Sequence, residues 1–281
     1  MTPCIDSHVH FWDGGVLEYP WLKGVAGLGP RYLPGDYAAE VAPPAPSRLV
    51  FVEADCDSKQ TVDEVSWIEH LAAGGVPIAG IVAQVKLDQG KASVEQLGRL
   101  RDRPLVRGVR HMLQYLPEPN ACASSELIAG ARRLAETDWV FDLCCHEGQL
   151  EHVIELVRQC PETRFVLDHA GKPSMKVDAF ELWKRRIARL GECPNVVCKF
   201  SGMSGLADPV RGIAAGVKPF FHVLLAYFGG DRLLYGSDWP VVKLTATLAE
   251  WQAAVAELLG PLSDAQRSAL MHDNAARVYR V

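Results

Sequence analysis

Two histidines one residue apart, His8 and His10, lie in the apolar stretch from Ile5 to Trp12. Apolar side chains at positions 5, 9 and 11 predict a short strand, in which residues 8 and 10 point to the same face. Two imidazoles on one face can hold a metal ion, polarise a carbonyl group or shuttle protons. Pairs of core or surface histidines show the same spacing, so the rest of the chain has to decide between these interpretations.

Ionisable side chains also follow the other apolar stretches of the chain. They are Glu53 and Asp55, Lys86, Arg110 and His111, His146 and Glu147, Asp168 and His169, Lys199, and Asp238. Ionisable groups are costly to bury without a purpose, so this pattern favours an enzyme over a binding module. The remaining histidines, at 70, 152, 222 and 272, fall in helix-like stretches and are expected to be structural or exposed.

The elements that must position these residues alternate regularly. Strands are predicted at 5–11, 48–54, 78–85, 105–111, 139–145, 164–169, 195–200 and 232–236. Helices are predicted at 60–73, 93–101, 125–136, 150–159, 180–190, 218–228, 246–259 and 263–271, with a final turn at 274–279.

The alternation of strands and helices predicts the fold class. Near-continuous apolar strands are covered on both faces, as in parallel sheets. Eight such units predict an α/β protein with a (β/α)8 TIM barrel, as a single domain over residues 1–281. An open doubly wound sheet is the alternative, but it would want a glycine-rich turn after the first strand. Active sites of barrels lie at the C-terminal ends of the strands, where the ionisable residues fall.

The segment at 11–47 is expected to cover the active site. It is rich in Gly, Pro and aromatic residues, among them Tyr19, Trp21, Tyr32 and Tyr37. It is too long and too interrupted by proline for one plain helix, and its aromatic content argues for an ordered cover.

Composition excludes several classes of function. The 281 residues carry a formal net charge of −5, which offers no basic patch for nucleic acid. No apolar stretch approaches the ~20 residues needed to cross a bilayer, and no signal peptide is expected before the first strand. The eight cysteines form no C-x-x-C pair and are expected to be reduced in a cytoplasmic protein.

Five motifs together resemble the amidohydrolase superfamily. They are the opening strand, Leu167–Pro173, Leu234–Pro240, Gly108–His111 and Cys198–Gly202. The chain is most similar to the sugar-lactonase branch, which includes L-fuconolactonases, L-rhamnonolactonases and 2-pyrone-4,6-dicarboxylate lactonases. The resemblance runs from Ile5 to Tyr279 and implies a deformed barrel that hydrolyses an ester or related carbonyl.

The resemblance also implies roles for four residues. His8 and His10 would be the first-strand pair, His169 the mid-barrel histidine, and Asp238 the general base that deprotonates the attacking water. Chemistry supports the last role, because a carboxylate flanked by imidazoles can take a proton from water and pass it to a leaving alkoxide. The alternative for Asp238 is a capping residue ahead of Trp239 and Pro240.

The metal content stays open between two interpretations. The fifth strand offers Cys144, Cys145 and His146 but no lysine, so a binuclear site bridged by a carboxylated lysine is not expected. A single Zn²⁺ could be held by His8, His10 and Asp238 with a water in the fourth position. The lactonase branch is similar to enzymes that work without metal, so no cofactor is expected to be strictly required.

Five further residues are predicted to bind a small-molecule lactone. Arg110, His111, His146 and Lys199 can grip carboxylate or hydroxyl groups, and Trp12 can stack on a ring. Arg110 and Lys199 could equally be paired structurally. Strand alternation allows only one of Arg110 and His111 to point inward, and His111 is favoured. By the same rule His169 is favoured over Asp168.

Two positions depart from the branch. The third strand ends in Lys86 where an acidic residue is expected, and Glu53 stands where a glutamine is expected. Lys86 could favour a more acidic lactone. The competing functions are a metal-dependent decarboxylase of the same superfamily and a catalytically dead barrel, although the latter would be expected to have lost Asp238 or His169. The oligomeric state stays open, a homo-oligomer included.

Overall fold

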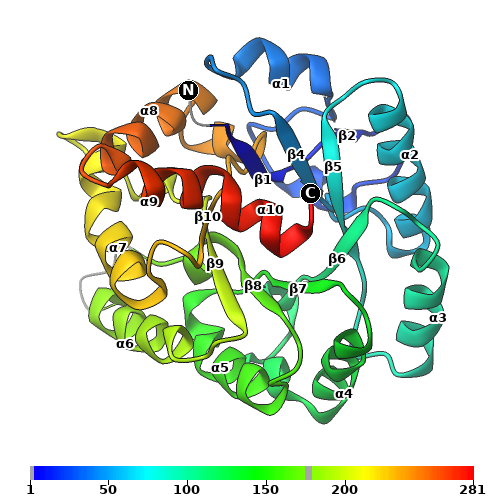
Figure 1. Ribbon diagram of the computed structural model, residues 1–281. Coiled ribbons are helices and arrows are strands. Elements are labelled where there is room, and N and C mark those ends of the chain that lie inside the picture. Colours follow the sequence, from blue (N-terminus) through cyan, green and yellow to red (C-terminus); the bar gives the residue numbers. More distant parts are fainter. Residues whose placement is uncertain (1–2, 175–178) are drawn as a thin grey trace.

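The computed structural model describes residues 3–174 and 179–281 and shows a barrel of eight parallel strands surrounded by helices (Figure 1). The hydrogen-bonded strand order is β1-β4-β5-β6-β7-β8-β9-β10. The prediction of a single (β/α)8 barrel is therefore confirmed, and the open sheet is not formed. The expectation about a signal peptide concerns the residues before the first strand, of which Met1 and Thr2 lie outside the described residues.

The strands lie close to their predicted positions. Their bounds are β1 Ile5–Val9, β4 Arg48–Val52, β5 Ile78–Gln84, β6 Val106–His111, β7 Val140–Leu143, β8 Phe165–Leu167, β9 Val196–Phe200 and β10 Leu233–Tyr235. The helices are α1 Pro34–Glu40, α2 Thr61–Ala73, α3 Lys91–Leu100, α4 Ser125–Arg133, α5 Leu150–Gln159, α6 Ala179–Gly191, α7 Gly212–Phe228, α8 Leu248–Leu259, α9 Asp264–Ser268 and α10 Asn274–Tyr279. Two expectations were wrong in detail. Helix α7 begins six residues before the predicted start at 218, and the final turn is the helix α10.

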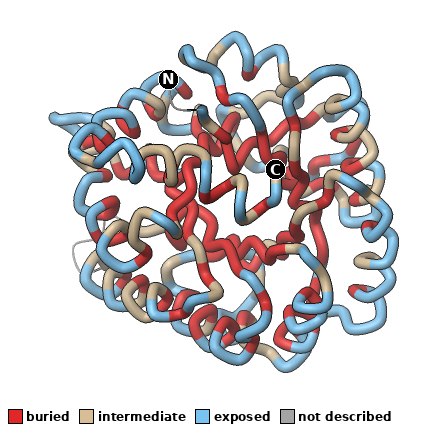
Figure 2. Tube along the Cα trace, viewed as in Figure 1, coloured by how far each residue is buried: buried red, intermediate tan, exposed pale blue. Residues whose placement is uncertain are grey.

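Apolar side chains bury the barrel wall on both of its faces. The outer layer packs against the helices, while an inner cluster that includes Ile5, Val50, Val166 and Leu234 fills the barrel interior. Figure 2 shows the ring of buried strands and the buried inner faces of the helices. This double burial explains why the strands appear in the sequence as continuous apolar runs.

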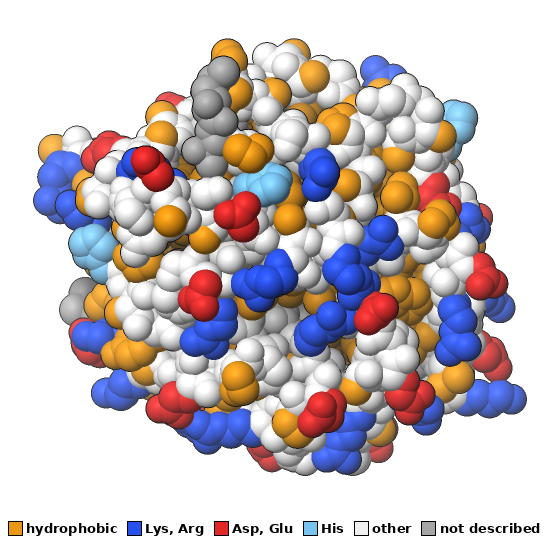
Figure 3. Space-filling model, viewed as in Figure 1, with side chains coloured by type: hydrophobic (Ala, Val, Ile, Leu, Met, Phe, Trp, Pro, Cys, Tyr) orange, Lys and Arg blue, Asp and Glu red, His pale blue; other side chains and the backbone are white. Residues whose placement is uncertain are grey.

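Helix α10 covers the N-terminal end of the barrel. Its Ala275 and Tyr279 belong to the inner cluster, and both are fully buried. On this face Lys and Arg side chains gather near the C-terminal end of α10 (Figure 3), where Arg280 and Arg164 both pair with Asp138. These charges lie at the floor of the barrel, at the opposite end from the polar strand ends.

The barrel closes where β1 meets the residues that follow β10. The Asp238 amide donates to the His8 carbonyl at 2.9 Å, and the His10 amide donates to the Trp239 carbonyl at 2.8 Å. Gly236 makes this approach possible, since a Cβ there would lie 2.8 Å from the Cβ of His8. The closing seam therefore joins the first and last motifs of the sequence.

The segment at 11–47 is ordered and folds over one side of the strand ends. Its short strands β2 Trp12–Asp13 and β3 Arg31–Tyr32 pair antiparallel, and helix α1 follows them. Trp12 and Tyr19 are buried within it. Within residues 3–174 and 179–281, no helix combines the length and apolar character that crossing a bilayer requires.

Candidate active site

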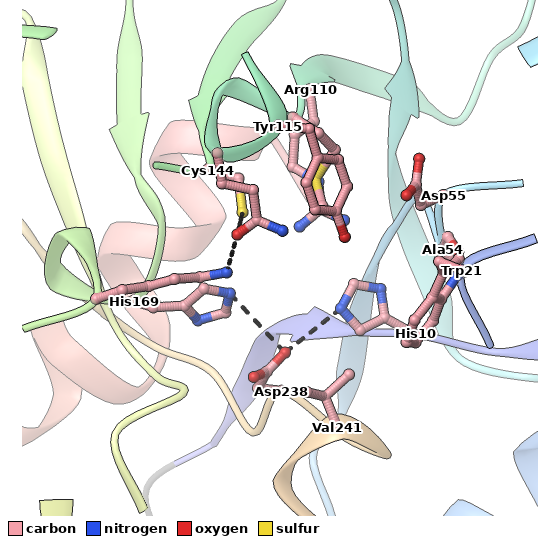
Figure 4. A pocket seen from close by; sticks show the side chains of 13 residues that line it. His10, Trp21, Ala54, Asp55, Arg110, Tyr115, Cys144, His169, Asp238 and Val241 are labelled. Atoms are coloured by element: carbon pink, nitrogen blue, oxygen red, sulfur yellow. Dashed lines mark hydrogen bonds and ion pairs between the residues drawn. The ribbon is translucent and has the colours of Figure 1, made fainter. Parts of the chain in front are cut away.

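A pocket of about 120 Å³ opens at the C-terminal ends of the strands (Figure 4). Most of the side chains that line it lie at the end of a strand or in the loop that follows one. The lining includes His10, Asp55, Arg110, Cys144, His169 and Asp238, together with Trp21 from the segment at 11–47. The structure thus brings side chains from six of the eight strand ends, those of β1, β4, β6, β7, β8 and β10, to one place.

Backbone strain gathers around this pocket. Asp55, His169, Lys172 and Asp238 have φ angles between 50° and 57° and all line the pocket. A positive φ costs a non-glycine residue of order 1 kcal/mol or more, and such strain is typical of functional sites. The strained turns aim these four side chains into the pocket as the chain leaves each strand.

Asp238 lies at the centre of three imidazoles. Its Oδ1 is 3.4 Å from His10 Nε2, 3.7 Å from His8 Nε2 and 3.9 Å from His169 Nε2. Burial alone would raise the pKa of Asp238, but His169, His10 and His8 outweigh burial and hold the pKa well below its usual range. Asp238 is therefore a carboxylate at neutral pH, and its side chain makes no helix cap.

Hydrogen-bond partners indicate the tautomers of His10 and His8. His10 Nδ1 lies 2.8 Å from the Val52 carbonyl, which can only accept, so Nδ1 carries a hydrogen, and in the neutral tautomer Nε2 is then a lone pair. His8 Nε2 lies 3.2 Å from that lone pair, and Lys199 Nζ lies 3.1 Å from His8 Nδ1. An ammonium and a guanidinium both only donate, and Arg110 lies 3.4 Å from His8 Nε2. The closer Lys199 contact favours the His8 tautomer with its hydrogen on Nε2.

A buried network of charges supports His8 from below. Lys199 is fully buried and pairs with Asp142 at 2.5 Å and with Asp168 at 3.1 Å. Arg110 binds Glu53 at 2.5 Å and Asp168 at 3.3 Å. Buried charges are tolerated when they are paired, so each member of this network depends on the others.

His169 is held on the other side of Asp238. Its Nδ1 lies 2.9 Å from the Ser201 hydroxyl. Gly202, at φ 61°, keeps the space clear, since a Cβ there would lie 2.5 Å from that ring nitrogen. Burial lowers the pKa of His169 to about 4, with Asp238 opposing, so the ring is uncharged at neutral pH.

Two sets of side chains could hold a metal ion. They are His8, His10 and Asp238, and His8, Asp168 and His169, with ligand atoms within 4.8 Å of one another. Imidazole and carboxylate ligands suit Zn²⁺, so both donor sets fit a single ion. To bind a metal through Nε2, His8 would have to carry its hydrogen on Nδ1. That nitrogen lies 3.3 Å from Asp168 Oδ1, which could accept the hydrogen, but it also faces the Lys199 ammonium.

The structure changes the orientation expected for two predicted residues. Arg110, rather than His111, points into the barrel, and its guanidinium also lies 3.4 Å from His8. His111 is directed instead to a neighbouring pocket. Asp168 and His169 both reach the interior, because β8 ends at Leu167 and the chain then leaves the strand geometry on which alternation rests.

The other predicted substrate residues lie away from Asp238. His146 is exposed and is not among the residues that line its pocket. Lys199 is buried beneath the pocket in the charge network. Trp12 is buried in the segment at 11–47, where its indole donates to the Gly29 carbonyl at 3.0 Å, and Trp21 takes the place at the pocket wall. Direct contact of His146, Lys199 and Trp12 with the substrate stays a prediction, and their positions do not support it.

Sequence reasoning missed several residues of the pocket. Lys172 lies within the motif Leu167–Pro173, and its ammonium donates to Gln114. Met112, Gln114 and Tyr115 follow β6 in a loop that contains a short 3-10 turn. Lys172 could have been predicted from its place inside a motif. Loop residues such as Gln114 show no periodic pattern from which a place in the pocket could be predicted.

Comparison with known proteins identifies the family. The model of the family described as "Amidohydrolase" matches residues 5–281. The chain belongs to the amidohydrolase family. An amidohydrolase of Burkholderia multivorans, solved with bound zinc, superposes with a TM-score of 0.86 at 30% identity and covers 99% of both chains.

Two curated relatives of this amidohydrolase carry lactonase or hydrolase names. L-fucono-1,5-lactonase of Burkholderia multivorans is 33% identical over 287 residues, which are 98% of this chain and 95% of that protein. A 2-pyrone-4,6-dicarboxylate hydrolase of Comamonas testosteroni is 26% identical, over 83% of this chain and 76% of that protein. The resemblance to the lactonase branch is thereby confirmed.

Proposed function

We propose that this amidohydrolase opens a lactone to its hydroxy acid, with Asp238 as the general base. The observation that carries the proposal is a buried, ionised carboxylate beside the uncharged imidazole of His169, in a pocket at the strand ends. The lactonase names of its relatives support the same reaction.

The proposed reaction needs a base, an electrophilic aid and a proton donor for the leaving group. Asp238 takes a proton from water, whose oxygen bonds to the lactone carbonyl carbon. Asp238 then returns the proton to the ring oxygen as the ring C–O bond breaks, which yields the hydroxy acid. The base and the acid are thus one carboxylate, and the atoms balance without any further reactant.

Lys172 is the candidate for stabilising the developing oxyanion. Arg110 uses three of its five N–H hydrogens on the Glu53 carboxylate, Asp168 and the Glu53 carbonyl, and both carboxylates neutralise it. Lys172 donates to Gln114 and keeps further ammonium hydrogens for a ligand. A cation aimed into a small buried pocket stabilises negative charge more than it would in water.

We propose that metal is not required for this reaction. His8, His10 and Asp238 would hold a single zinc ion, and when bound it would polarise the carbonyl and acidify water. Support for the metal-independent route is the Lys199 ammonium, which favours the His8 tautomer that cannot ligate through Nε2. A lactone is also a reactive ester and needs little electrophilic help.

The pocket favours a neutral sugar-acid lactone over a dicarboxylate lactone. A second carboxylate would want a second cation, but the guanidinium of Arg110 is already paired and Lys172 is assigned to the oxyanion. Burial, with Glu53 beside it, raises the pKa of Asp55 to about 6, so this pocket residue is largely a carboxylate at neutral pH and would repel an anionic substrate. Trp21, whose indole donates to the Ala54 carbonyl at 2.7 Å, extends the segment at 11–47 over the pocket as part of its cover.

A cytoplasmic location completes the proposal. Its support is that all eight cysteines are free, as is usual in a reducing compartment.

A screen of lactones with a pH indicator tests the proposed function. Aldonolactones and dicarboxylate lactones are offered with and without a chelator, and ring opening releases a proton. We expect turnover of aldonolactones that survives the chelator. Loss of lactone turnover with the chelator would overturn metal independence. Release of CO2 from aromatic carboxylates, without turnover of any lactone, would favour the decarboxylase alternative. No turnover of any lactone would overturn the proposed function.

A further inference from the structure

A second pocket of about 230 Å³ adjoins the pocket of Asp238. The two pockets share a wall, because Arg110, Met112 and Tyr115 line both. The side chains on the far side come from the end of β5 and its loop, namely Lys86 and Asp88, and from His111 at the end of β6. None of these three takes part in the mechanism above.

Polar atoms of this second pocket lack partners. His111 is 7% exposed, and its Nδ1 has no hydrogen-bond partner in the part of the chain that the structure describes. The same holds for Oδ1 of Asp88. An orphaned N–H is rarer than an orphaned acceptor, so an uncharged His111 carries its hydrogen on Nε2. Burying polar atoms without partners is costly, which indicates a ligand or water that completes them.

The charges of this pocket indicate what kind of ligand fits. Arg110 on the shared wall is already paired with Glu53 and Asp168, and the ammonium of Lys86 and the carboxylate of Asp88 balance each other, so neither an anion nor a cation is favoured. Burial lowers the pKa of His111, with Asp88 opposing, which keeps the ring uncharged at neutral pH. Lys86 and His111 can donate hydrogen bonds, and Asp88 can accept them. Hydroxyl groups, which both donate and accept, match this mixture.

We propose that the second pocket binds the polyhydroxylated chain of an aldonolactone whose ring lies beside Asp238. The inference rests on the proposed lactonase function and assigns the part of the substrate that the first pocket does not hold. Tyr115, 59% exposed on the shared wall, offers an aromatic edge along which such a chain passes from one pocket to the other.

Substrates of increasing length test this inference. The panel contains a four-carbon aldonolactone without a chain beyond the ring, and six- and seven-carbon aldonolactones. Wild type is compared with Asp88→Asn, Lys86→Met and His111→Leu. Lys91→Met, which removes an exposed lysine on the nearby helix α3, is the matched control.

The informative quantity is the ratio of kcat/KM for long over short lactones. Loss of one hydrogen bond to a charged group should lower this ratio about tenfold in Lys86→Met and Asp88→Asn, mainly through KM. Loss of a hydrogen bond to the uncharged ring in His111→Leu should lower it less, and the control should leave it unchanged. A ratio that stays constant in all variants overturns the inference. Wild-type turnover of the four-carbon lactone keeps the proposed function intact in that event, whereas no turnover of any lactone overturns both. Thermal unfolding of each variant shows whether it remains folded.

Discussion

The phenolic oxygen of Tyr279 lies 2.9 and 3.0 Å from the two carboxylate oxygens of Asp142, a residue 137 positions earlier. Asp142 pairs with Lys199, and Lys199 contacts His8. A hydroxyl on the floor helix α10 is thus linked through two buried side chains, Asp142 and Lys199, to the histidine beside Asp238.

Removing this hydroxyl should weaken the floor of the network. We expect Tyr279→Phe to lower the free energy of unfolding by about 1–3 kcal/mol, the usual cost of losing a hydrogen bond to a buried charged group. Burial already raises the pKa of Asp142 against the effect of Lys199, and loss of the donor should raise it further. Chemical denaturation measures the stability. Tyr227→Phe, at an exposed site, is the control, and equal stability of the two variants would contradict the role of Tyr279.

The base should be indispensable. We expect Asp238→Asn to lower kcat about 10³-fold or more while the protein stays folded, because an amide cannot accept the proton from water. Steady-state kinetics on the lactone identified by the screen, together with circular dichroism, measure both effects. Near-normal turnover would rule out Asp238 as the base.

Lys199 should determine how tightly zinc binds. We expect the double variant Asp142→Asn with Lys199→Met to bind zinc at least tenfold more tightly, since His8 could then donate from Nδ1 to Asp168 and ligate through Nε2. Replacing both partners avoids an unpaired buried charge. Competition with a chromogenic chelator measures the affinity. The matched control, Lys91→Met with Glu95→Gln, removes an exposed pair, and equal affinities in the two double variants would refute the idea.

The acid limit of activity should lie unusually low. The pKa of His169 is about 4 because the ring is buried, and below that pH a charged His169 would pair with Asp238 and hinder proton transfer. We expect kcat/KM to be flat from neutral pH down to about 5 and to fall near 4. A fall centred near 6.5, the value of an exposed histidine, would contradict this environment.

The lowered pKa of His169 also lowers the stability of the folded state in acid, since the unfolded chain takes up a proton at a higher pH than the folded chain does. The contribution of His169 is therefore present above pH 6.5 and is lost as the pH falls from 6.5 towards 4.

Glu64 should act on stability in the opposite direction. Burial, with Glu53 nearby, raises its pKa to about 8, so the folded state holds a proton that the unfolded chain releases near 4.5. The stability from Glu64 is fully present below pH 4.5 and is lost as the pH rises through 8. We expect Glu64→Gln, which keeps an acceptor for the Ala54 amide, to remove most of this loss. Urea denaturation at pH 5, 7 and 8.5 measures it, and parallel profiles of variant and wild type would contradict the shift.

The fold and the central residues of the site could be predicted from the sequence, but most of the residues around the pocket opening could not. Continuous apolar strands and helical periodicity located the eight strands, because both patterns report burial directly. His8, His10, His169 and Asp238 were found because each lies near the C-terminal end of a strand. Arg110 and His111 were assigned to the wrong faces of the strand. Alternation shows that the two side chains point to opposite faces, but it does not show which of the two faces the barrel interior.

The rest of the site depends on geometry that composition does not encode. Lys172 and Asp55 enter the pocket through positive φ angles rather than through strand alternation. The pairing of Lys199 with Asp142 joins two strands, and no local pattern marks such a pair. The alternative that Arg110 and Lys199 are structural was the better guide for Lys199.

The closing seam of the barrel has a kinetic consequence. The contact between Ser237 and Asp6 spans 231 residues, so the chain must close nearly its largest loop before His8 meets Asp238. Local helices and neighbouring strands can form earlier. During refolding, catalytic activity should therefore return with the slowest phase, after most of the far-ultraviolet signal has recovered. Recovered activity therefore measures completed folding, because His8 and Asp238 come from opposite ends of the chain and both are needed in the site.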